Sequence, residues 1–143
     1  YREYYIFILI NSMGAVAAML FSAPTSPLVQ PRNLFGGHLI AATSAVLIDY
    51  VSNKKHHPDT YLMPPWVSAP MAPMVAIFIQ AKAGLIHPPS CSACLIYGMG
   101  LPYVKNIGWL YIACPVLLDC VLLLIAAVLI NNLSKDRSYP LYW

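Results

Sequence analysis

The fold is decided by a long apolar stretch, Pro73–Met99, which reads PMVAIFIQAKAGLIHPPSCSACLIYGM. Lys82 is its only charged residue, and His87-Pro88-Pro89 interrupts it near the middle. Because proline lacks a backbone N–H and disfavours helix at the residue before it, a helix that reaches His87 is expected to end there. A second helix can begin with a proline in its first turn. The stretch therefore predicts a broken helix inside a hydrophobic segment.

The composition of the whole chain indicates a membrane protein. Of its 143 residues, 59% are hydrophobic and only 9% are charged, against roughly 25% charged residues in soluble domains. A globule with so few charges could not cover its surface, so we interpret the chain as an integral membrane protein rather than an apolar soluble domain. The net charge is +3 and no basic run is longer than Lys54-Lys55, which argues against a nucleic-acid partner.

Four hydrophobic segments are long enough to cross a bilayer, since a membrane helix needs about 20 apolar residues. They are residues 4–23, 34–51, 73–99 (broken at 87–89) and 107–130. The sequence therefore predicts an all-α integral membrane protein with a four-span helical bundle, in a single domain that covers residues 1–143.

Four crossings would place both termini and the Lys54/Lys55 loop on one side of the membrane. That side would hold more basic residues than the other: Arg2, Lys54, Lys55, Lys135 and Arg137 against Arg32 and Lys105. By the positive-inside rule, we expect the first side to be cytoplasmic, matrix or stromal.

The two halves of the chain share a weak internal repeat. Residues 11–21 align with residues 87–97 at an offset of 76, and each segment is followed by a polar turn and a complete span. Interrupted helices at corresponding positions of two halves are the best sequence pointer to a transporter's binding site. The alternative is chance similarity among small apolar residues.

The interruption at the prolines suggests an anion site. A helix that begins at Pro89 would direct the free amides of its first turn, and its positive dipole end, into the membrane. The candidate substrate-binding residues come from both halves of the repeat: His87, Pro88, Pro89, Ser90, Cys91, Ser92, Asn11, Ser12 and Gly14. The alternative is a kink that serves packing alone, with His87 satisfying a nearby carbonyl.

Two further clusters have both a functional and a structural interpretation. Arg32, Asn33 and His38 stand at the less basic mouth, where Arg32 either gates an anion or pins a rigid corner by donating to free carbonyls. Asp119 lies near the middle of the last span, and we predict an intramembrane charge pair with Lys82. That pair would couple transport to protons or form a structural bridge.

No catalytic or cofactor-binding motif stands out. Cys91 and Cys94 form an isolated CxxC motif in apolar surroundings, which is weak evidence for a metal site and favours inert thiols. We find no nucleophile elbow, phosphate-binding loop or paired catalytic carboxylates. The sequence therefore predicts neither enzyme activity, nor a cofactor, nor a metal.

Taken together, these motifs resemble the HPP family of small integral membrane proteins, which is named for the His-Pro-Pro motif. The resemblance covers nearly the whole chain and rests on short elements in a fixed order: Ser12–Ala15, Ala23–Asn33, Gly36–Leu39, His87–Pro89, Gly108-Trp109, Asn131–Leu133 and Tyr139-Pro140. It implies a helical membrane bundle and, for some plastid and cyanobacterial members, nitrite transport. Family members usually follow the motif with Ala-Gly-Ala-Thr-Ala, whereas this chain has Ser90-Cys91-Ser92-Ala93-Cys94.

Two functional hypotheses follow for this chain in its lipid bilayer. The first is a small-anion (nitrite-like) transporter or channel, which would work as an oligomer because four short spans enclose little space. The second is a non-transporting accessory subunit of a large respiratory or photosynthetic membrane complex. We expect the chain to lie in an organellar inner membrane, mitochondrial or plastid.

Overall fold

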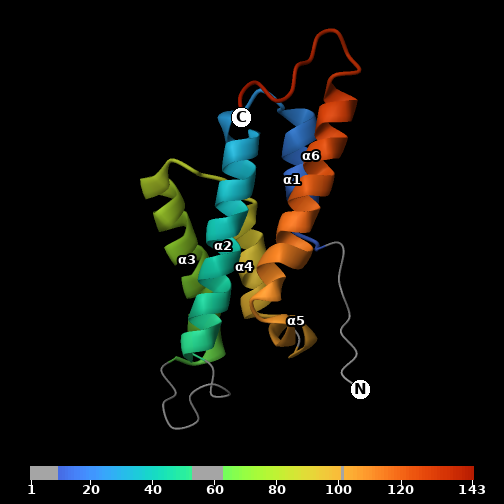
Figure 1. Ribbon diagram of the computed structural model, residues 1–143. Helices are drawn as coiled ribbons and strands as arrows, with labels where there is room; N and C mark the ends of the chain where they lie inside the picture. Colours follow the sequence, from blue (N-terminus) through green and yellow to red (C-terminus); the bar gives the residue numbers. More distant parts are fainter. Residues whose placement is uncertain (1–9, 53–62, 101) are drawn as a thin grey trace.

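A computed structural model describes residues 10–52, 63–100 and 102–143, and every regular element in these ranges is helical (Figure 1). The all-α prediction is thereby confirmed for the described residues. The elements in chain order are α1 (Met13–Ser22), the 3-10 helix η1 (Pro27–Val29), α2 (Pro31–Ser52), α3 (Pro65–Ala83), α4 (Ser90–Gly98), α5 (Pro102–Ile107), the π-helical η2 (Ile112–Leu117) and α6 (Leu118–Asn131).

Two helical stretches are long and apolar enough to cross a membrane, Pro31–Ser52 and Ile112–Asn131. The first coincides with the predicted second span and includes Pro31, which the helix accepts in its first turn. The second bends at Cys114, whose φ of −138° and ψ of 120° are not helical, because Pro115 disfavours helix at the preceding residue. The predicted last span is therefore shorter than residues 107–130, and α5 precedes it as a separate helix.

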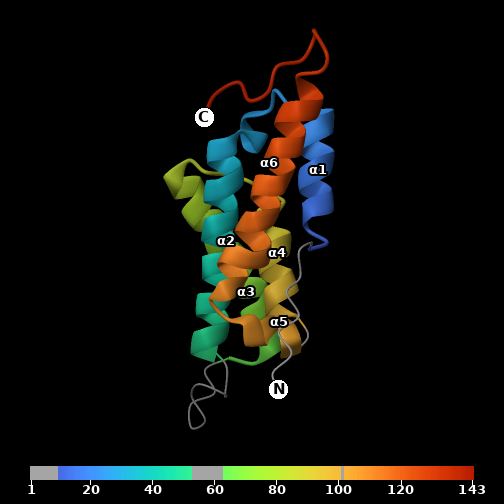
Figure 2. The same cartoon turned by 45° about the vertical axis from the view of Figure 1, so that its right-hand side comes forward.

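The predicted third span turns back instead of crossing once. α3 runs antiparallel to α2 and ends at Gly84, whose φ of +65° suits glycine in a helix cap. The chain then passes behind α2, and α4 returns along it in the opposite direction to α3 (Figures 1 and 2). The break is thus a loop of residues 84–89, which we call the HPP loop, and α3 ends before His87 is reached. The expectation that a second helix begins at the prolines is confirmed, because Pro89 is the N-cap of α4.

The C-terminal tail packs on the corner that joins α1 to α2. The guanidinium of Arg137 donates to the Phe21 carbonyl at 3.0 Å, and the Tyr139 hydroxyl donates to the Val29 carbonyl at 2.7 Å. Burial raises the pKa of Tyr139 to about 12. The hydroxyl is therefore protonated at neutral pH and acts as a hydrogen-bond donor. The tail is thereby fixed at the end of the bundle where α2 begins.

The tail and the C-terminal end of α2 lie at opposite ends of the bundle, whereas the prediction placed the tail and the loop after α2 on the same side of the membrane. α2 is 22 residues long, about 33 Å, and Ser52 lies at the opposite end of the bundle from the tail (Figure 1). Lys54 and Lys55 lie outside the described residues. Because the hairpin of α3 and α4 adds a reversal, the exposed Lys135 and Arg137 lie at the same end of the bundle as the exposed Arg32, and not at the opposite end as predicted.

Apolar side chains face outward and polar ones face inward. Large hydrophobic residues are exposed along α2, α3 and α6, among them Leu47, Phe78 and Leu129. Several polar residues in contrast are at most 1% exposed: Gln30, His38, Gln80, His87, Ser90, Asp119 and Asn131. Small residues allow close contact between membrane helices, and the core between α2, α3 and α4 consists largely of alanines: Ala41, Ala42, Ala45, Ala72, Ala76 and Ala93. This distribution fits a lipid-facing surface around a polar interior.

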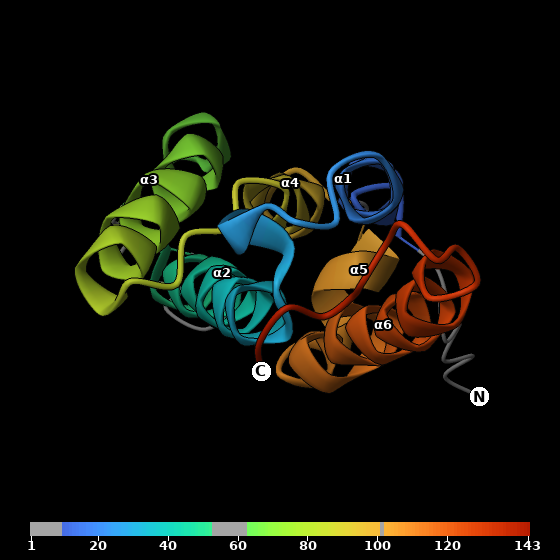
Figure 3. The ribbon, with the colours of Figure 1, turned by 90° about the horizontal axis from the view of Figure 1, so that it is seen from above.

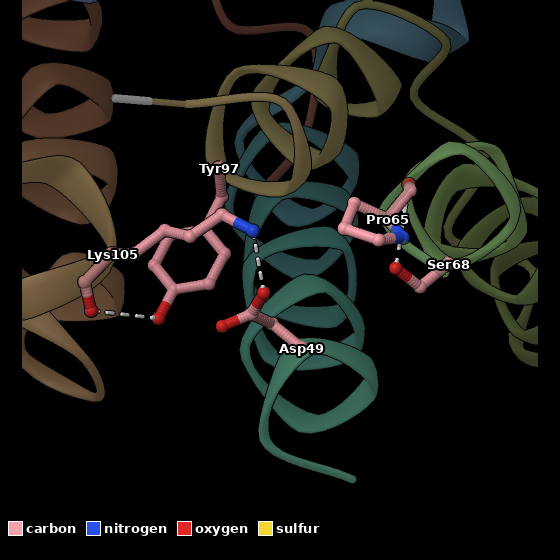
Figure 4. Close-up of polar contacts among 5 residues, drawn as sticks. All are labelled: Asp49, Pro65, Ser68, Tyr97 and Lys105. Atoms are coloured by element: carbon pink, nitrogen blue, oxygen red, sulfur yellow. Dashed lines mark hydrogen bonds and ion pairs between the residues drawn. The ribbon is translucent and has the colours of Figure 1, made fainter. Parts of the chain in front are cut away.

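An ion pair that the sequence analysis missed joins α5 to α2 at the far end of the bundle. The ammonium of Lys105 lies 2.7 Å from a carboxylate oxygen of Asp49, and both side chains are partly buried (Figure 4). The Tyr97 hydroxyl donates to the Lys105 carbonyl at 3.4 Å. These contacts connect α2, α4 and α5.

Replacing Asp49 with asparagine is expected to lower the free energy of unfolding by about 1–2 kcal/mol, because the partly buried Lys105 ammonium would lose its carboxylate. Lys105→Met should have a similar effect, and the double variant should recover most of the loss, as thermal unfolding in detergent would measure. Lys82→Met is the matched control, since Lys82 is exposed. Additive effects of the two single variants would show that the pair is not coupled.

Candidate functional site

A polar cluster in the interior is organised by Gln80 of α3. Its amide nitrogen donates to the Gly37 carbonyl of α2 at 3.1 Å and to the Ser90 hydroxyl of α4 at 2.8 Å. Its amide oxygen accepts from the backbone N–H of His87 at 3.0 Å. One side chain thus connects three helices and the HPP loop. The sequence analysis missed Gln80, although an uncharged amide inside an apolar helix was a usable signal.

The HPP loop is fastened at further points on both sides. The Asn33 amide donates to the Ile86 carbonyl at 3.1 Å, and Nδ1 of His87 lies 2.7 Å from the Leu28 carbonyl oxygen. The Ser90 hydroxyl donates to the His87 carbonyl at 2.6 Å. The loop is therefore a fixed part of the core, attached to η1 and to the start of α2.

Two glycines of α2 make room for this loop. A Cβ on Gly37 would lie 2.4 Å from Cβ of His87, and a Cβ on Gly36 would lie 2.8 Å from a methyl carbon of Leu85. The two glycines therefore permit the close approach of the HPP loop to α2.

His38 joins His87 rather than the predicted cluster with Arg32 and Asn33. The centroids of the two imidazole rings are 4.9 Å apart, and both side chains are fully buried. Arg32 is exposed on a different face of α2, because six helical positions of about 100° each separate it from His38. Asn33 serves the structural corner, whereas a gating role for Arg32 remains a prediction.

Both imidazoles have the same hydrogen-bonding state. Nδ1 of His38 lies 2.9 Å from the Leu34 carbonyl oxygen, and Nδ1 of His87 contacts the Leu28 carbonyl in the same way. A carbonyl oxygen only accepts, so each Nδ1 carries the hydrogen, and each Nε2 of a neutral ring is a bare acceptor. Within the described part of the chain, neither Nε2 has a hydrogen-bond partner.

The first amides of α4 are not free, contrary to the prediction. The N–H groups of Ser90, Cys91 and Ser92 donate to the carbonyls three residues earlier, at 3.1, 3.0 and 3.1 Å. This tight 3-10 turn follows from the two prolines, whose fixed φ suits such a turn. The start of α4 contributes its dipole to the interior and few free donors. Cys94 of the CxxC motif donates to the Ala41 carbonyl at 3.0 Å and serves helix packing.

The start of α1 is capped by Asp119 of α6. A carboxylate oxygen of Asp119 accepts from the backbone N–H of Ile10 at 3.0 Å. The buried Ser12 hydroxyl and the second oxygen of Asp119 have no partner among the described residues, and Asn11 and Gly14 are exposed.

The predicted pair of Lys82 and Asp119 is wrong. α3 and α6 lie on opposite sides of the bundle, with α2 and α4 between them (Figure 3). Lys82 is exposed, and its ammonium lies 5.8 Å from the centroid of the Phe78 ring. Hydropathy predicts how deep a residue lies in the membrane but not which side of its helix it is on. A similar predicted depth of Lys82 and Asp119 is therefore not enough to predict that they are partners.

The two short helices α1 and α4 form an inverted pair, which we call the half-helices. Both begin near the middle of the molecule, and they run toward opposite ends (Figures 1 and 2). α4 packs on α2 of the first half of the chain, whereas α1 packs on α6 of the second half. The positive ends of both helix dipoles therefore face the middle of the bundle.

The hydrogen bonds at the two helix starts correspond at an offset of 77. The N–H of Met13 donates to the Ile10 carbonyl, and that of Ser90 donates to the His87 carbonyl. The N–H groups of Ile10 and His87 are each capped by a side chain, Asp119 and Gln80 respectively. The internal repeat thus has a structural counterpart, shifted by one residue from the alignment of the sequence.

Comparisons with known proteins agree with this architecture. The family model of the HPP transmembrane region matches residues 2–140. Two Dictyostelium discoideum proteins, each named as a transmembrane protein, are 33% identical over 138 residues and 34% identical over 135 residues. These matches cover 95% and 94% of this chain but 45% and 41% of the relatives, so the chain spans less than half the length of either. No solved structure matches the chain. With a match that extends over nearly its entire length, the chain belongs to the HPP transmembrane region family.

Proposed function

We propose that the chain is a small-anion transporter or channel with a nitrite-like substrate, and that the anion passes where the two half-helices begin. One observation carries this proposal, namely that two inverted half-helices start in the middle of the bundle. Each helix N-terminus is equivalent to roughly half a positive charge, so two of them match about one negative charge. This balance favours a small monovalent anion.

The membrane arrangement in this proposal follows the helix directions. α2 and α6 cross the bilayer in opposite directions, and the hairpin of α3 and α4 enters from one side and turns back at the HPP loop. Non-helical backbone at membrane depth is tolerated where protein buries it, and the HPP loop satisfies this condition through Gln80, Asn33 and Leu28.

The test is nitrite uptake into liposomes that contain the purified chain. Uptake should saturate with nitrite concentration and should exceed passive leakage into protein-free liposomes. Ser12→Ala should reduce it about tenfold, because Ser12 is a buried hydroxyl at the start of α1 without a partner in the described part of the chain. Ser22→Ala is the matched control, since this hydroxyl is exposed and bonds to Ala18 of its own helix.

Two results would contradict the proposal. The first is uptake that does not saturate or does not exceed passive leakage. The second is equal uptake by the Ser12→Ala and Ser22→Ala variants. Absence of flux together with stable co-purification in a large membrane complex would favour the accessory-subunit hypothesis.

A further inference from the structure

We propose that the transported anion moves together with a proton held by His38 and His87, so that the net charge carried is zero. This inference rests on the proposed anion transport and specifies its substrate as an anion plus a proton. The first argument is a census of positive charge. In the described ranges, Arg32, Lys82, Lys135 and Arg137 are exposed, and Lys105 is paired with Asp49 at the far end of the bundle.

Among the residues that the structure describes, the interior therefore lacks a fixed cation for the anion. None of the described Lys and Arg side chains is buried. The one fully buried charged residue among the described residues is Asp119, which carries a carboxyl group and not a cation. An unpaired charge in a membrane interior is costly, so a buried ion needs a counter-charge. The helix dipoles supply part of this charge, and a bound proton can supply the rest.

The two imidazoles are arranged to hold that proton. Their rings are 4.9 Å apart, each Nδ1 is committed to a carbonyl, and both Nε2 atoms are buried acceptors without a donor within the described residues. A proton on one Nε2 converts that ring into a cation with an N–H group available to an anion. No bond in the substrate changes, since the proton and the anion only bind and leave together.

Other titratable groups lie on the elements around the pair. On α4, Cys94 donates to the Ala41 carbonyl, and Cys91 is half-buried in the first turn. In the tail, Tyr139 donates to the Val29 carbonyl. On α6, one oxygen of Asp119 accepts from the Ile10 N–H, and its second oxygen has no partner among the described residues. The neighbouring polar groups from α2 and α3, Asn33 and Gln80, do not titrate. The histidine pair is the proton site beside the start of α4, whereas Asp119 lies at the start of α1.

The position of the pair also explains why proton and anion should bind together. His87 lies three residues before Ser90, the first residue of α4, so a proton placed there is repelled by the positive dipole end of that helix while the site is empty. A bound anion removes this repulsion. By linkage, each ligand then raises the affinity for the other.

The test measures nitrite and proton movement in the same liposomes, with a pH-sensitive dye inside and a membrane potential set by a potassium gradient with valinomycin. Passive movement of nitrous acid is subtracted with protein-free liposomes at mildly alkaline pH. We expect one proton per nitrite, and a nitrite flux that an imposed potential does not change. His38→Gln and His87→Gln should each reduce coupled flux about tenfold or more. His57→Gln, a matched substitution elsewhere in the chain, should not.

The outcomes separate this inference from the transport proposal. No saturable nitrite flux in the wild-type chain contradicts transport, and the inference fails with it. Nitrite flux that follows the imposed potential, without proton movement, overturns the inference and leaves transport intact. Coupled flux that survives in both histidine variants overturns the assignment of the proton to this pair. The wild-type potential test needs no variant, and circular dichroism with gel filtration shows whether each variant is folded.

Discussion

Replacing Gly37 with alanine is expected to lower the free energy of unfolding by about 2–3 kcal/mol, because the new methyl group has no space. Its Cβ would lie 2.4 Å from Cβ of His87 and 3.3 Å from the Leu85 carbonyl oxygen. Both atoms belong to the rigid part of the HPP loop. The loop cannot withdraw without stretching its bonds to Gln80 and Leu28. Thermal or denaturant unfolding in detergent measures the loss.

Two other glycines provide graded controls for this prediction. A Cβ on Gly36 would meet a methyl carbon of Leu85, which can rotate away, so Gly36→Ala should be milder. A Cβ on Gly14 of α1 meets nothing within 4 Å, and alanine there should stabilise the chain by about 0.5–1 kcal/mol through helix propensity. If Gly37→Ala is no more destabilising than Gly36→Ala, the HPP loop is not packed against α2 as described.

The sequence predicts where the helices break and not where the chain goes afterwards. Proline chemistry places the start of α4 at His87-Pro88-Pro89, and Asn11-Ser12 marks the start of α1. The direction of α4 depends on the turn at Gly84 and on the packing of the HPP loop against Gly37. Neither feature produces a periodic hydrophobic pattern in the sequence, so the sequence does not predict this direction. The sequence does not predict the reversal between α3 and α4, and the tail therefore lies at the other end of the bundle from the one expected.

Partners in the site were harder to predict than its location. Asp119 caps a backbone N–H, that of Ile10, and a backbone group carries no side-chain signature in the sequence. Proximity in the chain suggests a cluster of His38 with Arg32, but six helical positions place the two side chains on different faces. The role of the buried Gln80 carries no charge signal in the sequence, because its amide is neutral.

Replacing Gln80 with leucine is expected to be at least as destabilising as the glycine variant, by about 2–4 kcal/mol. Leucine has a similar size, so it leaves little cavity, but three hydrogen bonds disappear. The Gly37 carbonyl and the His87 N–H would then be buried without those partners. Water does not reach such groups easily at membrane depth, so their loss is not compensated.

A double-mutant cycle with Ser90→Ala shows whether this loss arises in the polar cluster. The Ser90 hydroxyl accepts from Gln80 at 2.8 Å and donates to the His87 carbonyl, so it should matter less once Gln80 is leucine. We expect the two effects to be non-additive by about 0.5–1 kcal/mol or more. Gln80→Glu, which keeps an acceptor for the His87 N–H, should lie between wild type and leucine. Additive effects would mean that Gln80→Leu acts by general repacking of α3, and that Gln80 does not organise the HPP loop.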